Sequence, residues 1–118
     1  MKELWPLEKI KELDFASPTG FMKVKEFLPY VIEEVTVDIS KQYSILRKSM
    51  KEQGQIVPIH VSRDNNRLRD GIHRIAIATG LGWNYMYVSS ARYMSEWDST
   101  EEGQKYWKLW NWRLNGLR

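Results

Sequence analysis

Strand-like and helix-like segments alternate in the middle of the chain, and this alternation limits the fold more than any other feature. Residues 58–61 and 85–88 are short runs of β-branched and aromatic side chains, which are typical of strands. The turn residues 64–66 join the first run to residues 67–69 as a hairpin, and an apolar helix follows and ends near Gly80. This order excludes a β-sandwich and a helix bundle and predicts an α/β or α+β fold.

The N-terminal part of the chain predicts short elements separated by turns. Pro6 suits the first turn of a helix that continues to Leu13, and residues 17–20 form a turn. Residues 21–28 fit either a helix or a strand, and we expect Pro29 to end that element in both cases.

A longer helix is expected before the hairpin. Residues 35–37 are a β-branched run that predicts a strand, and Ser40 suits the N-cap of the helix that follows. Apolar side chains then recur at helical spacing, and Gly54 provides a left-handed C-cap.

Length and composition indicate one globular domain, residues 1–118, with 42% apolar and 28% charged residues. The chain has no cysteine, which excludes disulfides, thiolate metal sites and cysteine nucleophiles and fits a reducing cytosol. No stretch approaches the roughly 18 consecutive apolar residues that a membrane span requires. We therefore expect a soluble cytoplasmic protein that makes no membrane contact.

Charge is unevenly distributed along the chain. Residues 41–92 hold nine Lys and Arg against three Asp and Glu, whereas residues 1–40 hold five against eight. A basic middle segment is typical of proteins that bind an anionic partner such as a nucleotide or a nucleic acid. A solubilising surface would account for the same charge pattern.

The most informative motif is the junction between the hairpin and the helix, which contains Asp70, Gly71, His73 and Arg74. Glycine lets a ligand approach the backbone, and the first turn of a helix presents amide groups and a positive dipole to an anion. Basic side chains are unfavourable at that end of a helix, so a bound phosphate would explain them. The alternative is that Asp70 caps the helix and pairs with Arg74 while His73 packs half-buried.

The ordered set of features in residues 35–88 resembles the N-terminal domain of the ParB/sulfiredoxin superfamily. A helix ending in glycine, the strand that begins Pro58-Ile59-His60-Val61, the hairpin, the Gly71-Ile72-His73-Arg74 turn and a helix ending in Leu81-Gly82 follow one another in the family's order. This resemblance implies a small α+β domain with a mixed sheet and packed helices.

The family's functional residues are carried over position by position. Gly71, His73 and Arg74 match the turn that binds nucleotide phosphates, and Pro58 and Ile59 match the strand that lines the nucleotide pocket. The resemblance implies a domain that acts in DNA metabolism, with a nucleoside triphosphate and Mg²⁺ as its ligands. Some members are nucleases or use nucleotides as substrates, so nuclease or nucleotidase activity is one expectation.

The chain also departs from the family. Ile72 occupies the position of the reactive cysteine of sulfiredoxins, which excludes sulfinic acid reduction. The Glu-Asn-x-x-Arg segment and the helix-turn-helix of chromosome-partitioning ParB proteins are absent from the sequence. A CTP-gated DNA clamp is therefore not expected.

Carboxylates near the turn are the candidates for catalysis. Asp70 and Asp38, with Glu34 as a weaker choice, could orient a nucleophile or hold Mg²⁺ together with bound phosphates. His60 and His73 have no fixed ligand spacing, so no protein metal site is predicted.

Three arginines on or beside the hairpin, Arg63, Arg67 and Arg69, are candidates for contact with a nucleic-acid backbone. Arg67 and Arg69 are two residues apart and so share one face of a strand. The alternative is that these charges protect an edge strand against aggregation.

The C-terminal tail predicts a tryptophan-rich helix over residues 99–115, opened by a capping box of Ser99 and Glu102. Its tryptophans suit an interface with a second copy or a partner protein, base stacking, or completion of the core. The second functional hypothesis is therefore a non-enzymatic interaction protein, of the kind found in phages or mobile elements. Its candidate contact residues are Trp107, Trp110 and Trp112.

Overall fold

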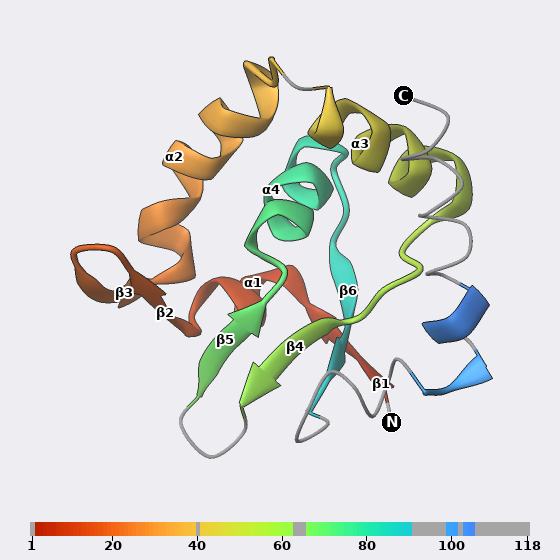
Figure 1. Cartoon of the computed structure of the whole chain (residues 1–118). Helices are drawn as coiled ribbons and strands as arrows, with labels where there is room; N and C mark the ends of the chain where they lie inside the picture. The colour runs from red at the N-terminus through yellow and green to blue at the C-terminus, as the bar shows by residue number, and fades with distance from the viewer. Residues whose placement is uncertain (1, 40, 63–65, 91–98, 102, 106–118) are drawn as a thin grey trace.

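The computed structural model describes residues 2–39, 41–62, 66–90, 99–101 and 103–105, and it confirms the α+β class. The described strands form one six-stranded mixed sheet in the order β1-β6-β4-β5-β2-β3 (Figure 1). The strands are β1 (Lys2–Pro6), β2 (Asp14–Ser17), β3 (Gly20–Lys23), β4 (Ile59–Ser62), β5 (Arg67–Asp70) and β6 (Tyr85–Ser89), and the helices are α1 (Leu7–Lys11), α2 (Val24–Thr36), α3 (Gln42–Gln53) and α4 (Ile72–Gly80).

The predicted hairpin and the strand that follows it form the middle of the sheet. β4 pairs with β5 as an antiparallel hairpin and with β6 in parallel. β1 continues the sheet beyond β6, and the β2–β3 hairpin continues it beyond β5. The chain crosses from β5 to β6 through α4, so the turn at Gly71 lies where the central hairpin ends and this crossover begins.

The helices cover one face of the sheet. In Figure 1, α2, α3 and α4 lie together on one side of β4, β5 and β6. Buried side chains on the strands meet buried side chains of the helices in one apolar core, since alternate strand residues point to the same face. The fully or nearly fully buried members are Ile10, Leu13, Val24, Val31, Ile59, Val61, Ile75, Ala78, Met86 and Val88.

The N-terminal elements differ from the sequence predictions. The structure places Lys2–Pro6 in an edge strand, and α1 begins at Leu7 with Pro6 as its N-cap and ends at Lys11. The predicted turn over residues 17–20 is confirmed, because it joins β2 to β3. The first residues form a strand because they pair with β6, whose residues lie 79 to 87 positions later in the sequence.

The prediction that Pro29 ends its element is wrong. The ambiguous segment is a strand through Lys23 and then a helix that passes through Pro29 to Thr36. Pro29 is exposed, and so is Lys25, whose carbonyl loses its helical donor. The Glu26 carboxylate fixes the start of the helix, because it accepts a hydrogen bond from the Lys23 amide at 3.2 Å.

The predicted strand over residues 35–37 is also wrong, because Val35 and Thr36 form the last turn of α2 and Val37 is its C-cap. The Thr36 hydroxyl donates to the Ile32 carbonyl at 2.7 Å, a bond that threonine makes within helices. Val35 packs against the apolar core. Packing therefore outweighs the β preference of this run.

Helix α3 begins at Gln42, after Lys41 in the left-handed region at φ 63°. The predicted N-cap, Ser40, lies outside the described residues. A carboxylate four residues before the helix acts as a cap, since Asp38 Oδ2 accepts a hydrogen bond from the Ser44 amide at 2.8 Å. The predicted end is confirmed, because Gly54 is the C-cap with φ 75°.

The Gln55 side chain forms sheet-like hydrogen bonds with β6 at a point before the first residue of β4, Ile59. Gln55 Nε2 donates to the Tyr87 carbonyl at 2.8 Å, and Gln55 Oε1 accepts from the Tyr87 amide at 2.6 Å. The same Nε2 donates to the Val57 carbonyl at 3.0 Å. The loop between α3 and β4 is thereby fixed against β6.

The described residues include the first positions of the predicted C-terminal helix. Residues 101 and 103–105 are helical, and Thr100 caps the helix because its hydroxyl accepts from the Gly103 amide at 3.1 Å. This cap lies one residue after the predicted one, Ser99, and Glu102 lies outside the described residues. In the described part of the chain, no helix has the length and apolar character to cross a membrane.

Candidate functional site

A cleft of about 230 Å³ opens where β5 ends and α4 begins. The structure brings three of the predicted phosphate-site residues, Gly71, His73 and Arg74, to this cleft together with the predicted catalytic candidate Asp70. The first turns of α3 form the opposite wall. The cleft is lined by Gln42, Tyr43, Leu46, Asp70, Gly71, His73 and Arg74.

Gly71 is required at its position by conformation and by packing. It is the N-cap of α4 with φ 116°, a region that side chains rarely adopt. A Cβ built there would lie 2.5 Å from Ile59 Cγ2. The first helical bond runs from the Ile75 amide to the Gly71 carbonyl at 3.0 Å, so the amides of residues 72–74 have no acceptor within the helix.

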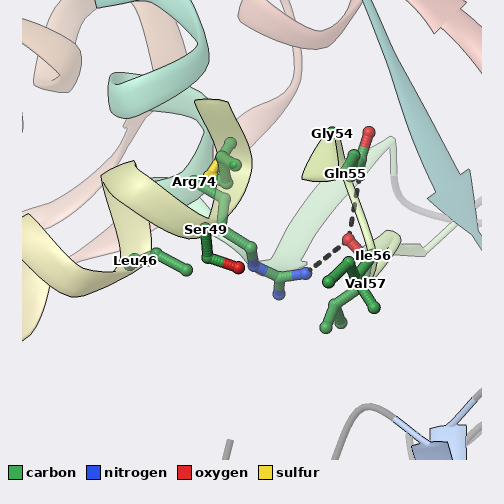
Figure 2. A pocket seen from close by; sticks show the side chains of 8 residues that line it. Leu46, Ser49, Gly54, Gln55, Ile56, Val57 and Arg74 are labelled. Carbon is green, nitrogen blue, oxygen red and sulfur yellow. Dashed lines mark hydrogen bonds between the residues drawn. The ribbon is translucent and has the colours of Figure 1, made fainter. Parts of the chain in front are cut away.

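The Arg74 guanidinium is turned toward the backbone that leads into β4 (Figure 2). Its Nη1 donates to the carbonyls of Val57 at 2.8 Å and Pro58 at 2.9 Å, and its Nη2 lies 3.2 Å from Asp70 Oδ2. Only 12% of the side chain is exposed, whereas 61% of the Asp70 side chain is exposed. Arg74 therefore holds α4 against the start of β4 and keeps a positive charge at the wall of the cleft.

Pro58 and Ile59 contact the turn at Gly71 and Arg74 from the side that faces away from the cleft. The Pro58 carbonyl accepts from Arg74, and the fully buried Ile59 packs against Gly71. Neither residue lines the cleft. A smaller pocket of about 10 Å³, also bounded by Arg74, separates α3 from the loop before β4 and has room for about one water molecule (Figure 2).

His73 belongs to a cluster that sequence reasoning did not assemble. Its ring stacks on Tyr43 with centroids 4.6 Å apart and an interplanar angle of 14°. Glu34 Oε1 lies 3.3 Å from His73 Nε2 and 3.1 Å from the Tyr43 hydroxyl, which is itself 3.2 Å from His73 Nε2. Three helices thus contribute one residue each to a closed set of hydrogen bonds.

This cluster has a distinct electrostatic character. Burial raises the pKa of the Tyr43 phenol above its ordinary value of 10.0, and the hydrogen bond to Glu34 raises it further. The neutral phenol is therefore the form that donates to Glu34. Tyr43 is one of the side chains that recur at helical spacing before Gly54, but only the structure places it against His73.

The two predicted catalytic carboxylates have different surroundings. Asp70 is at the rim of the cleft beside Arg74, whereas Asp38 accepts from the Ser44 amide and does not line the cleft. Within the described residues, no group of three or more histidine, aspartate or glutamate side chains is placed to hold a metal ion.

The remaining predicted contact residues are spread over other parts of the chain. Arg67 and Arg69 lie on β5, and the Arg67 guanidinium stands 4.4 Å from the centroid of the Phe21 ring on β3. Arg63 lies outside the described residues, as do the predicted partner-binding residues Trp107, Trp110 and Trp112.

No protein-family model, curated protein or solved structure matches the chain. The resemblance to the ParB/sulfiredoxin superfamily therefore remains a prediction from the motifs.

Proposed function

We propose that the cleft between α3 and α4 binds the phosphates of a nucleotide, and that the chain is a ParB-like domain acting in DNA metabolism. The observation that carries the proposal is the convergence on one cleft of Gly71, His73, Arg74 and the first turn of α4. The amides of the first helical turn and the positive end of the helix dipole favour an anion at this position.

The two basic residues have different roles in this proposal. Arg74 is held by two carbonyls, so it positions the turn and contributes a fixed positive charge. His73 lines the cleft with 36% of its side chain exposed, so it is the residue that would contact a phosphate oxygen. The Tyr43 stack and the Glu34 carboxylate restrict the orientation of its ring.

Mg²⁺ fits this cleft only as a partner of the bound phosphates. Asp70 is the carboxylate at the rim, and Mg²⁺ is commonly held by one or two carboxylates with phosphate oxygens and water. A magnesium ion would also reduce the repulsion between Asp70 and the phosphate groups.

Hydrolysis of a phosphate ester, as in a nuclease or nucleotidase, is the second candidate function. The contact between His73 Nε2 and Glu34 Oε1 favours it, because a carboxylate that orients a histidine is a common arrangement for proton transfer. Asp70 would then orient the attacking water or hold the metal. Release of inorganic phosphate or cleavage of an oligonucleotide, each lost in Asp70→Asn, would establish this function.

Isothermal titration with ATP, CTP and GTP in the presence of Mg²⁺ tests nucleotide binding. The decisive variant is His73→Gln, since Arg74 variants would also disturb packing. We expect His73→Gln to weaken binding by about tenfold, the value of one hydrogen bond to a charged group. His60→Gln is the matched control, because His60 lies on β4 and does not line the cleft. Absence of binding by all three nucleotides, or equal binding by His73→Gln, would contradict the proposal.

A further inference from the structure

The sheet presents a second face, opposite the helices. Leu68 on β5 and Met86 and Val88 on β6 are buried in the core, so their neighbours along each strand point to the other side. Register extends this assignment to the edge strands, since Leu4 pairs with Tyr87 and Ala16 pairs with Phe21. We call this surface the open face and define it by Leu4, Phe21, Arg67, Arg69, Tyr85 and Tyr87.

The open face exposes large apolar and aromatic side chains, which are usually buried in a folded protein. The exposed fraction is 65% for Phe21, 56% for Tyr85 and 37% for Tyr87, and Leu4 is 54% exposed beside them. Single exposed apolar residues are common in proteins, but several on one sheet face are typical of an interaction surface.

The arginines of this face are held differently from Arg74. The Arg67 guanidinium stands over the Phe21 ring, and its buried Nε has no hydrogen-bond acceptor among the residues that the structure describes. Within those residues, neither Arg67 nor Arg69 forms an ion pair. Asp14, which pairs in register with Arg67, offsets one positive charge. The centre of the face therefore keeps a net positive charge between two groups of aromatic rings.

The spacing of these groups suits an extended chain. β4, β5 and β2 separate the tyrosines on β6 from Phe21 on β3, which places them about 19 Å apart across the sheet. Arg67 and Arg69 on β5 lie between them. Aromatic rings that alternate with cations across a sheet match the bases and phosphates of an unpaired nucleic-acid strand.

We propose that the open face binds single-stranded nucleic acid, with bases stacked on Tyr85 and Tyr87 and on the platform that the Arg67 guanidinium and the Phe21 ring form together, and with a phosphate paired to Arg69. The positive charge at its centre favours this occupant over an apolar protein surface. A duplex buries its bases within its own stack and would use only the arginines. This proposal is independent of the nucleotide cleft, which is lined by other residues.

Fluorescence anisotropy with a labelled oligothymidine of about 15 nucleotides, on the full chain, tests the stacking. We expect Phe21→Ala and Tyr85→Ala each to weaken binding by at least about fivefold, the lower limit for loss of one stacked base. The matched control is Tyr30→Ala on α2, whose side chain is 66% exposed and lies away from the sheet face. It should bind as the wild type does.

The salt dependence of the same measurement tests the phosphate contacts. Arg69→Gln should reduce the slope of log Kd against log salt by about 0.7, the value for one phosphate contact on a single strand. Lys48→Gln, which removes an exposed charge on α3, should leave the slope unchanged. An oligouridine of equal length should bind in the same way, because both strands offer bases and phosphates.

Three results would overturn the proposal. They are no binding at low salt, a duplex that binds as tightly as the single strand, and equal weakening by Tyr30→Ala and Tyr85→Ala. Self-association of the wild type that Tyr85→Ala abolishes, without any oligonucleotide binding, would assign the face to a second copy instead. His73→Gln should retain oligonucleotide binding, so failure of this proposal is distinguishable from failure of the nucleotide cleft.

Discussion

The two sides of the hairpin hold arginine in opposite ways. Arg74 is 12% exposed and donates to two backbone carbonyls and to Asp70, whereas Arg69 is exposed on the sheet face without an ion pair to a described residue. Both residues belong to the basic middle segment, and the sequence does not distinguish them. The difference shows that a basic side chain within a recognisable turn can be committed to packing, while one outside it remains available to a ligand.

Gly71→Ala tests the close packing of the turn that contains Arg74, and we expect it to have the largest effect. The substitution forces a side chain into a left-handed conformation and into contact with Ile59, so we expect a loss of about 3 kcal/mol in the free energy of unfolding. Denaturation with urea, followed by circular dichroism, measures this loss.

Gly54→Ala is the control for conformation alone. Its φ is 75°, but no atom lies within 4 Å of the Cβ that alanine would add, so we expect a loss of only about 1–2 kcal/mol. Equal losses in the two variants would show that the contact with Ile59 does not matter.

The second test compares the arginines directly. Arg74→Met keeps the length of the side chain but leaves the Pro58 carbonyl without the donor that the structure shows, at a cost of about 2 kcal/mol. Arg69→Met should change the free energy of unfolding by less than about 0.5 kcal/mol, as is usual for an exposed side chain. Similar effects in both variants, measured by urea denaturation, would remove the distinction between the two sides.

The third test concerns the cluster beside the cleft. Tyr43→Phe removes the hydroxyl that contacts Glu34 and His73, and we expect a loss of about 1 kcal/mol at neutral pH.

The pH dependence of the same variant has a definite sign. The Tyr43 pKa is raised in the folded state, so above its ordinary value of 10.0 the unfolded chain releases the proton first. Stability therefore falls as pH rises from 10.0 through the folded-state pKa. Tyr43→Phe should have a shallower fall in melting temperature over this range, and an unchanged slope would contradict the raised pKa.

The sequence predicts correctly those elements that are determined by residues close together along the chain. The hairpin has a turn between two β-branched or charged runs, and α3 ends at a glycine that adopts the expected left-handed conformation. The four predicted cleft residues lie within five consecutive positions, so a single turn brings them together. Predictions of this kind depend on neighbours along the chain.

The elements that the sequence did not reveal depend on distant partners. β1 exists because its residues pair with β6, and Val35 is helical because it packs against the core. The contact between Glu34 and His73 joins residues 39 positions apart. The direction of the Arg74 side chain depends on carbonyls 16 and 17 residues earlier, which no local motif specifies.

The Gln55 side chain has a consequence for the way the sheet tolerates change. A primary amide offers the same donor and acceptor as a peptide group, so β6 meets Gln55 as if β4 were one residue longer. Glutamate at position 55 would keep the acceptor and lose the donor, setting its oxygen against the Tyr87 carbonyl. The effective length of β4 therefore depends partly on the Gln55 side chain. A single mutation at position 55 would shorten the hydrogen-bonded sheet without altering any strand residue.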